Sequence, residues 1–292
     1  MAITQSPSTV PRGPVTATLN FSHPPPAGVT AFNYVEAPPA GQPQRNLTPD
    51  ARAVPISDIR GREADFSLDR DAFQVIRGVA PSAEESDALA SHFADDSSIA
   101  ARYYPEVEKL LLEAIPGSSR IYIFDHTIRR AAPDARRKAV QNVHIDQTLY
   151  SATKRVHRHM GADADALLRG RYRIVNVWRT LNRNPVESMP LAFASSSSLE
   201  DKDVVPVEHR YPEGYVGQTA AIAYNPNQRW YYLSGMTGDE RLLLECFDSE
   251  GAKEGSGVAG GRVPHTAFDD PRSRPDAEGR ESIEVRALVF GP

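Results

Sequence analysis

The feature of this sequence that most constrains the fold is a succession of short strand-like segments in its second half. β-branched and aromatic residues gather there in segments separated by turn residues, and a regular alternation of strands with helices is missing. Such segments favour antiparallel pairing, so the sequence predicts a mainly β fold with flanking helices, as a barrel or a sandwich. The expected strands lie at 118–125, 139–148, 171–179, 204–210, 218–224, 229–233, 241–247 and 281–290.

Helices are expected before these strands and at one place among them. A helix capped by Ser82 opens near 81–85, a second helix covers about 98–113, and a helical insertion covers about 151–168. Residues 1–60 are rich in proline and hold at most one strand, near 16–21. We therefore divide the chain into a Pro-rich N-terminal arm, 1–60, and one domain, 61–292.

The roles of the arm and of the insertion stay open at this point. The arm can wrap its own barrel or reach a neighbouring subunit, which leaves a homo-oligomer open, and the insertion can act as a lid over a site.

Charge and composition exclude several classes of partner. The net charge of -5 and the pI near 5.9 give no broad attraction to nucleic acid or to anionic membranes. No apolar stretch approaches the roughly 20 residues needed to span a bilayer. The single cysteine excludes an internal disulfide, and the first residues lack the pattern of a secretory signal, so we expect a cytoplasmic protein.

One strand-like segment carries a candidate for metal binding. His144 and Asp146 lie two residues apart, so on a strand their side chains point to the same face and can ligate one ion. With a second histidine, they would form the facial triad of non-haem Fe(II) oxygenases. The alternative is a partly buried histidine that is hydrogen-bonded to its neighbours, since a His-x-Asp tripeptide is common by chance.

The last strand makes His265 the best candidate for the third ligand. Its residues Ile283, Val285, Ala287 and Val289 form one apolar face, which leaves Arg280, Ser282, Glu284 and Arg286 on the other. A guanidinium and a hydroxyl two residues apart can hold a carboxylate, and we expect the distal carboxylate of 2-oxoglutarate. A surface ion pair of Arg280 with Glu281 or Glu284 remains the alternative.

Several motifs in this order resemble a known family. HIDQ at 144–147, RIVNVWR at 173–179, YNPNQRWYY at 224–232, CFDS at 246–249, HTAF at 265–268 and RESIEVRAL at 280–288 are similar to the hydroxylase/desaturase group of Fe(II)/2-oxoglutarate oxygenases. This group includes the gibberellin desaturase-like and cephem methoxylase-like proteins of fungal and bacterial biosynthesis. The resemblance runs from about residue 121 to the C-terminus, with a weaker match over 73–80.

The resemblance implies a double-stranded β-helix (a jelly-roll, cupin-like core) with iron held by His144, Asp146 and His265. It also implies that Arg280 and Ser282 bind 2-oxoglutarate, with Arg286 as the less favoured arginine. The chain departs from the family pattern at Arg179-Thr180, where Arg-Pro is expected, and this affects the pocket edge. The further candidates for the pocket are Asn176, Trp178, Arg179, Arg229, Trp230 and Tyr232, although strand aromatics are often core residues.

The function implied is a dioxygenase that uses Fe(II), 2-oxoglutarate and O2. It would hydroxylate, desaturate or cyclise a small natural product or amino acid at an unactivated C-H bond, releasing succinate and CO2. A cupin-type metal enzyme without 2-oxoglutarate would need no carboxylate-binding Arg280 and Ser282. A noncatalytic binding barrel would bind neither iron nor 2-oxoglutarate.

Overall fold

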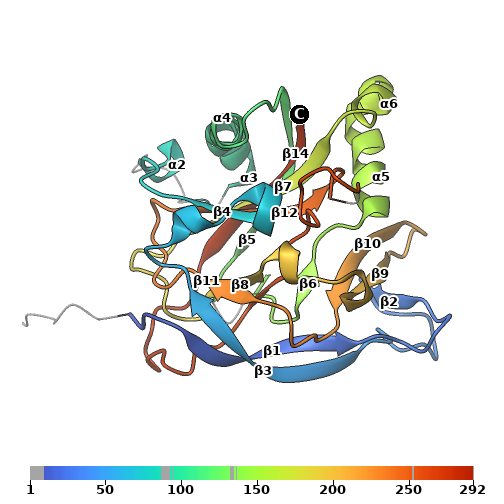
Figure 1. The fold of residues 1–292 in the computed structure, drawn as a ribbon, viewed down its shortest axis with the longest axis horizontal. Helices are drawn as coiled ribbons and strands as arrows, with labels where there is room; N and C mark the ends of the chain where they lie inside the picture. Colours follow the sequence, from blue (N-terminus) through green and yellow to red (C-terminus); the bar gives the residue numbers. More distant parts are fainter. Residues whose placement is uncertain are drawn as a thin grey trace, which may run out of the picture.

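Two β-sheets face each other in this fold (Figure 1). The computed structural model describes residues 10–86, 93, 95–131, 135, 137–251 and 253–291. The nine-stranded sheet runs, in order, β1 (Val15–His23), β3 (Thr48–Asp58), β11 (Trp230–Tyr232), β8 (Leu191–Ala194), β13 (His265–Ala267), β6 (His144–Ile145), β10 (Val216–Ile222), β9 (Val204–Arg210) and β2 (Ala31–Tyr34). The five-stranded sheet runs β4 (Phe73–Ile76), β12 (Arg241–Asp248), β7 (Tyr172–Thr180), β14 (Ser282–Phe290) and β5 (Arg120–Arg129). This two-sheet arrangement confirms the mainly β prediction.

Short helical segments connect the strands or cover the sheets. They are η1 (Glu63–Asp65), α1 (Leu68–Asp71), α2 (Ala83–Ser86), α3 (Asp96–Ser98), η2 (Ile99–Tyr103), α4 (Tyr104–Ala114), α5 (Leu149–Met160), η3 (Gly161–Asp163), α6 (Ala164–Leu167), η4 (Ser196–Ser198) and η5 (Asp201–Asp203). The helix expected at 98–113 is thus divided among α3, η2 and α4, and residues 87–92, which follow the expected start of the first helix, lie outside the described residues. No helix in the described part of the chain is both long and apolar enough to cross a bilayer.

Strand β7 shows how the alternation of side chains divides the core. Val175 and Val177 pack with α4 and with the apolar face of β14. On the other face of β7, Tyr172 and Ile174 pack against α5, while Trp178 packs between the two sheets. Asn176 lies between these two apolar clusters, so the inner face of β7 places one polar group in the middle of the fold.

The helical insertion closes one end of the space between the sheets. Thr148 caps α5 and forms a capping box with Ser151, so the helix begins directly after the segment that contains β6. Ala152, Val156 and Met160 of α5 are buried in the core. The insertion is therefore a packed part of the barrel end.

The expectation of at most one strand in the arm was wrong, because the arm supplies β1, β2 and β3. Two prolines conceal β3 in the sequence. Pro49 and Pro55 stand opposite Ser22 and Thr16 of β1, while β11 pairs only with the last three residues of β3. An edge position tolerates prolines because their missing N–H is not needed for a neighbouring strand.

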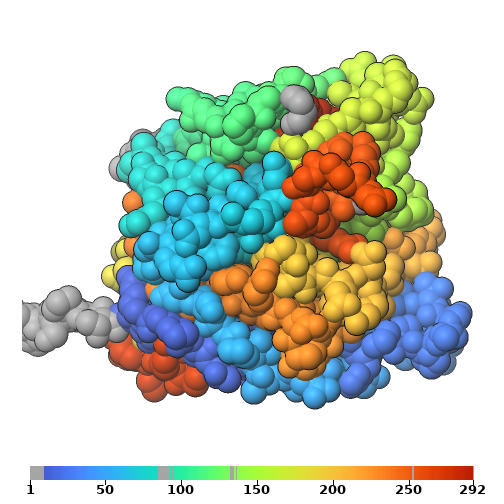
Figure 2. Space-filling view, in the orientation of Figure 1, coloured from blue at the N-terminus to red at the C-terminus, as the bar shows by residue number. Residues whose placement is uncertain are grey.

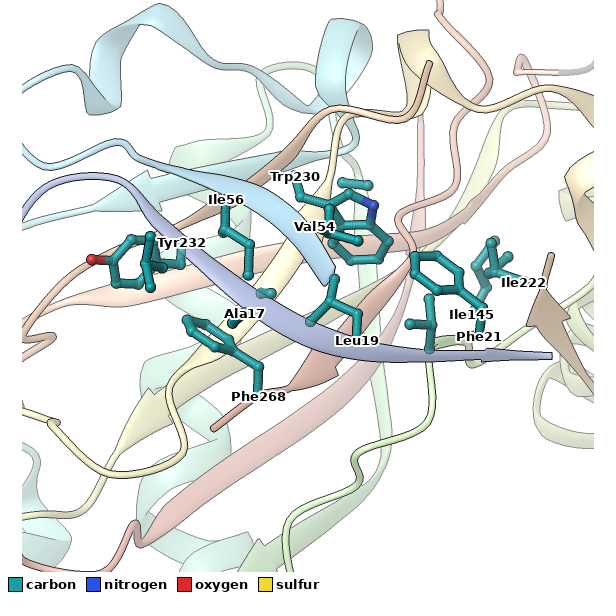
Figure 3. Close-up of a cluster of buried hydrophobic side chains, with 14 of the residues drawn as sticks. Ala17, Leu19, Phe21, Val54, Ile56, Ile145, Ile222, Trp230, Tyr232 and Phe268 are labelled. Atoms are coloured by element: carbon teal, nitrogen blue, oxygen red, sulfur yellow. The ribbon is translucent and has the colours of Figure 1, made fainter. Parts of the chain in front are cut away.

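The arm also completes a hydrophobic core. Leu19 and Phe21 of β1 are each 1% exposed and pack with Trp230 and Ile145 from the rest of the sheet (Figure 3). The N–H of Val143 donates to the carbonyl oxygen of Asn20 at 2.9 Å, so β1 also reaches the segment before β6. The arm thus pairs with its own chain, and its surface follows the lower edge of the molecule (Figure 2).

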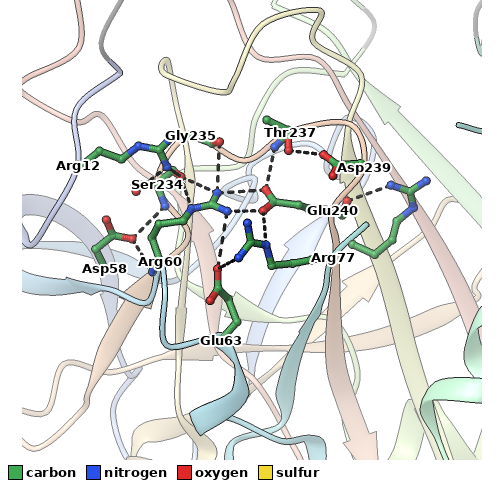
Figure 4. Close-up of polar contacts among 11 residues, drawn as sticks. Arg12, Asp58, Arg60, Glu63, Arg77, Ser234, Gly235, Thr237, Asp239 and Glu240 are labelled. Carbon is green, nitrogen blue, oxygen red and sulfur yellow. Dashed lines mark hydrogen bonds and ion pairs between the residues drawn. The ribbon is translucent and has the colours of Figure 1, made fainter. Parts of the chain in front are cut away.

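A polar cluster joins the arm to the loop between β11 and β12 (Figure 4). Arg60 donates to both carboxylate oxygens of Glu240 and, at 2.7 Å, to the carbonyl oxygen of Ser234. Arg12 also bonds to Ser234, and the N–H of Ser234 donates to Asp58 at 3.1 Å. These contacts hold the start and the end of the arm against one loop.

Candidate metal centre

Three side chains from β6, its flank and β13 converge between the sheets. The register places His144 directly opposite His265, and also opposite Ala221 of β10. The Nε2 atoms of His144 and His265 lie 3.3 Å and 4.0 Å from Oδ1 of Asp146, and the three ligand atoms all lie within 4.8 Å of one another. Strand β6 has two residues where ten were expected, but the alternation that directs His144 and Asp146 to one face is retained.

Hydrogen bonds orient all three of these side chains. Nδ1 of His144 lies 2.8 Å from the carbonyl oxygen of Asn142, and Nδ1 of His265 lies 3.2 Å from that of Val263. Because a carbonyl can only accept, each Nδ1 carries a proton, so each ring in its neutral form presents the lone pair of Nε2 to the centre. Asn176 donates from Nδ2 to Oδ2 of Asp146 at 2.7 Å, which leaves Oδ1 for an ion.

The charges within the triad are strongly coupled. Burial favours the neutral form of Asp146, but hydrogen bonding from His144 and the charge of His265 hold the pKa of Asp146 well below its usual range. Burial also opposes protonation of His144, but Asp146 outweighs it and raises the pKa of His144. Burial lowers the pKa of His265 to about 4, and the charge of His144 acts in the same direction. At neutral pH the triad is therefore one carboxylate with at least one neutral imidazole.

This donor set fits Fe(II). Two imidazole nitrogens and one carboxylate oxygen can form a facial triad, which leaves the other coordination positions of the metal open. Each ligand also makes a hydrogen bond through the polar atom that does not face the centre. Such bonds are typical of metal ligands, since they fix the orientation of the side chain.

A small cavity of about 40 Å³ adjoins the triad and is lined by three arginines. They are Arg129, Arg280 and Arg286, together with Glu284 and Trp178. Arg286 is held by Asp125 at 2.6 Å and donates to Thr127 at 2.8 Å. Arg129 donates to the carbonyl oxygen of Lys138 at 2.9 Å.

Arg280 differs from the other two in burial: it is 4% exposed, whereas Arg129 and Arg286 are partly exposed, and it forms no ion pair with any described carboxylate. Its Nη1 donates to the carbonyl oxygen of Met189 at 2.8 Å, its Nε has no partner among the described residues, and its guanidinium lies 5.7 Å from the ring centre of Trp178. Burial lowers the pKa of Arg280 to about 10, and nearby Arg129 acts in the same direction. A buried cation without a counter-charge is costly, so this position favours an anionic ligand.

Three of the pocket candidates lie at this centre. Asn176 contacts Asp146, and both Trp178 and Arg286 line the cavity with the triad. Ser282 is 1% exposed and pairs in register with Arg129 and Thr180, on the inner face of β14. It lies on the predicted face, two residues from Arg280.

The structure does not bring the other four candidates to this cavity. Arg179 points to the outer face of β7, where its guanidinium lies 5.4 Å from the ring centre of Phe93. Arg229 is exposed and donates to Ser197 at 2.7 Å. Trp230 and Tyr232 face the core under the arm, because β11 turns them toward β1 (Figure 3). The cover over Trp230 and Tyr232 was not expected, because the sequence predicted a strand near β1 but not β3.

Two charged residues of the cavity, Arg129 and Glu284, are absent from the predicted site. Burial raises the pKa of Glu284, and the charge of Asp146 adds to this effect. The alternation along the last strand had placed Glu284 on the same face as Arg280 and Ser282, so the sequence did indicate that Glu284 lies near the site. Arg129 was missed because β5 continues to residue 129, whereas the expected strand ended at 125.

Comparisons with known proteins give a consistent result. The family model described as an oxidoreductase/YMDC permease-like domain matches residues 19–290. The hydroxylase/desaturase poxK of Penicillium oxalicum is 36% identical over 303 residues, which cover 96% of this chain and 92% of poxK. The Fe(II)/2-oxoglutarate-dependent dioxygenase nvfI of Aspergillus novofumigatus is 30% identical over 262 residues, which cover 88% of this chain and 90% of nvfI.

A solved structure extends this likeness to the fold. The iron and alpha-ketoglutarate-dependent endoperoxidase NvfI matches with a TM-score of 0.84 at 28% identity, over 96% of this chain and 99% of that chain. This match is consistent with the double-stranded β-helix that the motifs implied. With the His-Asp-His triad in place, the chain belongs to the fungal hydroxylase/desaturase family of Fe(II)/2-oxoglutarate-dependent dioxygenases.

Proposed function

We propose that this dioxygenase oxidises an unactivated C-H bond of a small natural product, with Arg280 and Ser282 as the residues that bind the distal carboxylate of 2-oxoglutarate. His144, Asp146 and His265 hold Fe(II) beside them. The observation that carries the proposal is the buried Arg280, which lines the same cavity as the three metal ligands and lacks a carboxylate partner among the described residues.

The fit to 2-oxoglutarate follows from its two ends. One end must reach the metal and the other carries a free carboxylate, so the protein needs a cation at a short distance from the triad. Arg286 is already paired with Asp125, and Arg129 is partly exposed, whereas Arg280 is buried. Arg280 is therefore the arginine best suited to a bidentate contact, and the hydroxyl of Ser282 can add a further bond.

Bound Fe(II), with 2-oxoglutarate and O2, supplies the oxidising chemistry and releases succinate and CO2. The residues of this chain hold the reactants in place. Asn176 fixes the rotation of Asp146, and the carbonyls of Asn142 and Val263 fix the tautomers of His144 and His265. Positioning of the substrate carbon then decides among hydroxylation, desaturation and ring closure.

Anaerobic titration with Fe(II) and then 2-oxoglutarate tests the proposal. We expect a weak visible charge-transfer band for wild type, and a much weaker affinity for 2-oxoglutarate in Arg280→Ala at unchanged affinity for Fe(II). Arg229→Ala, which removes an exposed arginine, is the matched control and should behave as wild type.

The outcomes separate the alternatives. Iron binding without a band in wild type would favour the cupin-type enzyme that needs no 2-oxoglutarate. Failure of a folded protein to bind iron would favour the noncatalytic barrel. A band that is equally strong in Arg280→Ala would show that another residue holds the distal carboxylate.

A further inference from the structure

A second cavity, of about 310 Å³, adjoins the metal centre. Val140 and His144 line both this cavity and the smaller one that contains Arg280. Its size is within the range of about 300 to 1,000 Å³ that is typical of pockets for small molecules. A larger cavity of about 980 Å³ lies beside α5, but His144, Asp146 and His265 are absent from its lining.

The register places part of the lining of this second cavity on the face of the sheet that carries the metal ligands. His144 of β6 is opposite Ala221 of β10, and Thr219 of β10 is opposite Val207 of β9. Residues in register, and residues two apart on a strand, point to the same face. The side chains of Ala221, Thr219 and Val207 therefore continue the surface that begins at His144, and β9 lies about 10 Å from β6 at the usual strand spacing.

The walls of the cavity are largely apolar, and the N-terminal arm supplies much of them. Phe21, Phe32 and Leu47 of the arm line the cavity together with Val207 and Ala221 of the sheet, and Leu47 packs against the apolar cluster that contains Val207 and Ala221. These groups would bury a hydrocarbon skeleton and exclude water from it.

The polar groups of the lining lie at defined places. The Nε2 atom of His209 and the hydroxyl of Thr219 form a hydrogen bond of 2.8 Å with each other. Arg45 is exposed at the mouth, and its guanidinium forms no ion pair or hydrogen bond with another described side chain. Among the described residues of this lining it is the one arginine or lysine, so it is the group that can recognise an anion.

We propose that this cavity is the substrate site, and that it accepts an apolar small molecule whose skeleton lies over Val207, Thr219 and Ala221, with an anionic group bound by Arg45 of the arm. The inference rests on the proposed function, because it takes the metal at His144 as the reacting centre. The arm is then the element that determines substrate specificity.

Two fluorescent probes test the site without knowledge of the natural substrate. Anilinonaphthalene sulfonate is apolar with one anionic group, and phenylnaphthylamine is a neutral analogue of similar shape. The protein is loaded with 2-oxoglutarate and either Mn(II) or diamagnetic Zn(II), and the NMR signals of each probe are recorded. Because relaxation by Mn(II) falls steeply with distance, probes in this cavity should be broadened by Mn(II) and not by Zn(II).

The variants separate the two parts of the proposal. Arg45→Ala should weaken the sulfonate about tenfold and leave the neutral probe unchanged, whereas Arg52→Ala, an exposed arginine of the same arm outside the lining, should change neither. Ala221→Phe should fill the cavity and abolish the broadening of both probes, and Thr219→Phe provides a second blocking variant if the first does not fold.

Failure of this proposal differs from failure of the proposed function. Probes that bind without Mn(II)-dependent broadening, or that bind equally well to both blocking variants, would overturn the substrate site while the charge-transfer band with Fe(II) and 2-oxoglutarate persists. An equal affinity of Arg45→Ala for the sulfonate would overturn the role of Arg45. Loss of the band in wild type would instead contradict the proposed function.

Discussion

Replacing Asn176 by alanine is expected to weaken metal binding, although Asn176 does not contact the metal. Its Nδ2 donates to Oδ2 of Asp146 at 2.7 Å, and the side chain is fully buried, so water cannot replace it easily. A hydrogen bond to a charged group contributes about 1.5 to 3 kcal/mol. At about 1.4 kcal/mol for each factor of ten, the dissociation constant of Fe(II) should rise about ten- to hundredfold.

The isosteric change Asn176→Asp should be more harmful than alanine. It places a second carboxylate beside Asp146 in a buried setting, where like charges repel strongly. The two variants together separate loss of a donor from added repulsion.

The assay is competition for Fe(II) against a chelator of known affinity, under anaerobic conditions. Asn225→Ala is the control, because it also removes a buried amide, which there bonds to Asp203 and Glu200 away from the triad. It should lower stability without changing metal affinity. An unchanged dissociation constant in Asn176→Ala, with intact folding, would refute the idea that this amide orients Asp146.

Three further predictions concern the cosubstrate, the proton balance and the arm. Arg280→Lys should lower the affinity for 2-oxoglutarate about tenfold, since an ammonium cannot form the bidentate contact. Titration of the charge-transfer band measures this affinity, and its full retention would contradict the prediction. Metal must displace any proton on its ligands, and the pKa of His144 is raised above 6.5 whereas that of His265 is lowered to about 4. Near pH 6.5, metal binding should therefore release protons from His144 and none from His265, and the affinity for the metal should decrease as pH falls. Calorimetry in buffers of different ionisation enthalpy measures the number of protons released. No proton release would contradict the prediction. Leu19→Ala should lower the free energy of unfolding by about 2 to 5 kcal/mol and shift the urea midpoint of a single cooperative transition downward. Separate unfolding of the arm would show that it is not part of the core.

The triad could be predicted from the sequence because its geometry depends on local alternation. His144 and Asp146 reach one face even though β6 has two residues, and the alternation along β14 correctly placed Arg280, Ser282, Glu284 and Arg286 on the inner side. Strands β7, β9 and β12 were also found close to their observed bounds.

The parts of the fold and of the site that were not predicted depend on contacts between distant segments of the chain. Strand β3 contains Pro49 and Pro55, and its pairing with β1 is visible only once both segments are placed in space. The same omission led to the assignment of Trp230 and Tyr232 to the pocket, since their cover by Leu19 and Phe21 is non-local. Strands β8 and β13 are four and three residues long, too short for a pattern to indicate them.

The anchoring of the arm by Arg60, Ser234 and Glu240 has an evolutionary consequence. Those contacts hold both ends of residues 12–60, whereas the stretch that contains Arg45 lies between them at the surface. Changes in that stretch would leave the anchors, the metal triad and Arg280 untouched. Under the role proposed for Arg45, a change in this one surface segment would alter what the enzyme oxidises and leave its oxidising apparatus intact.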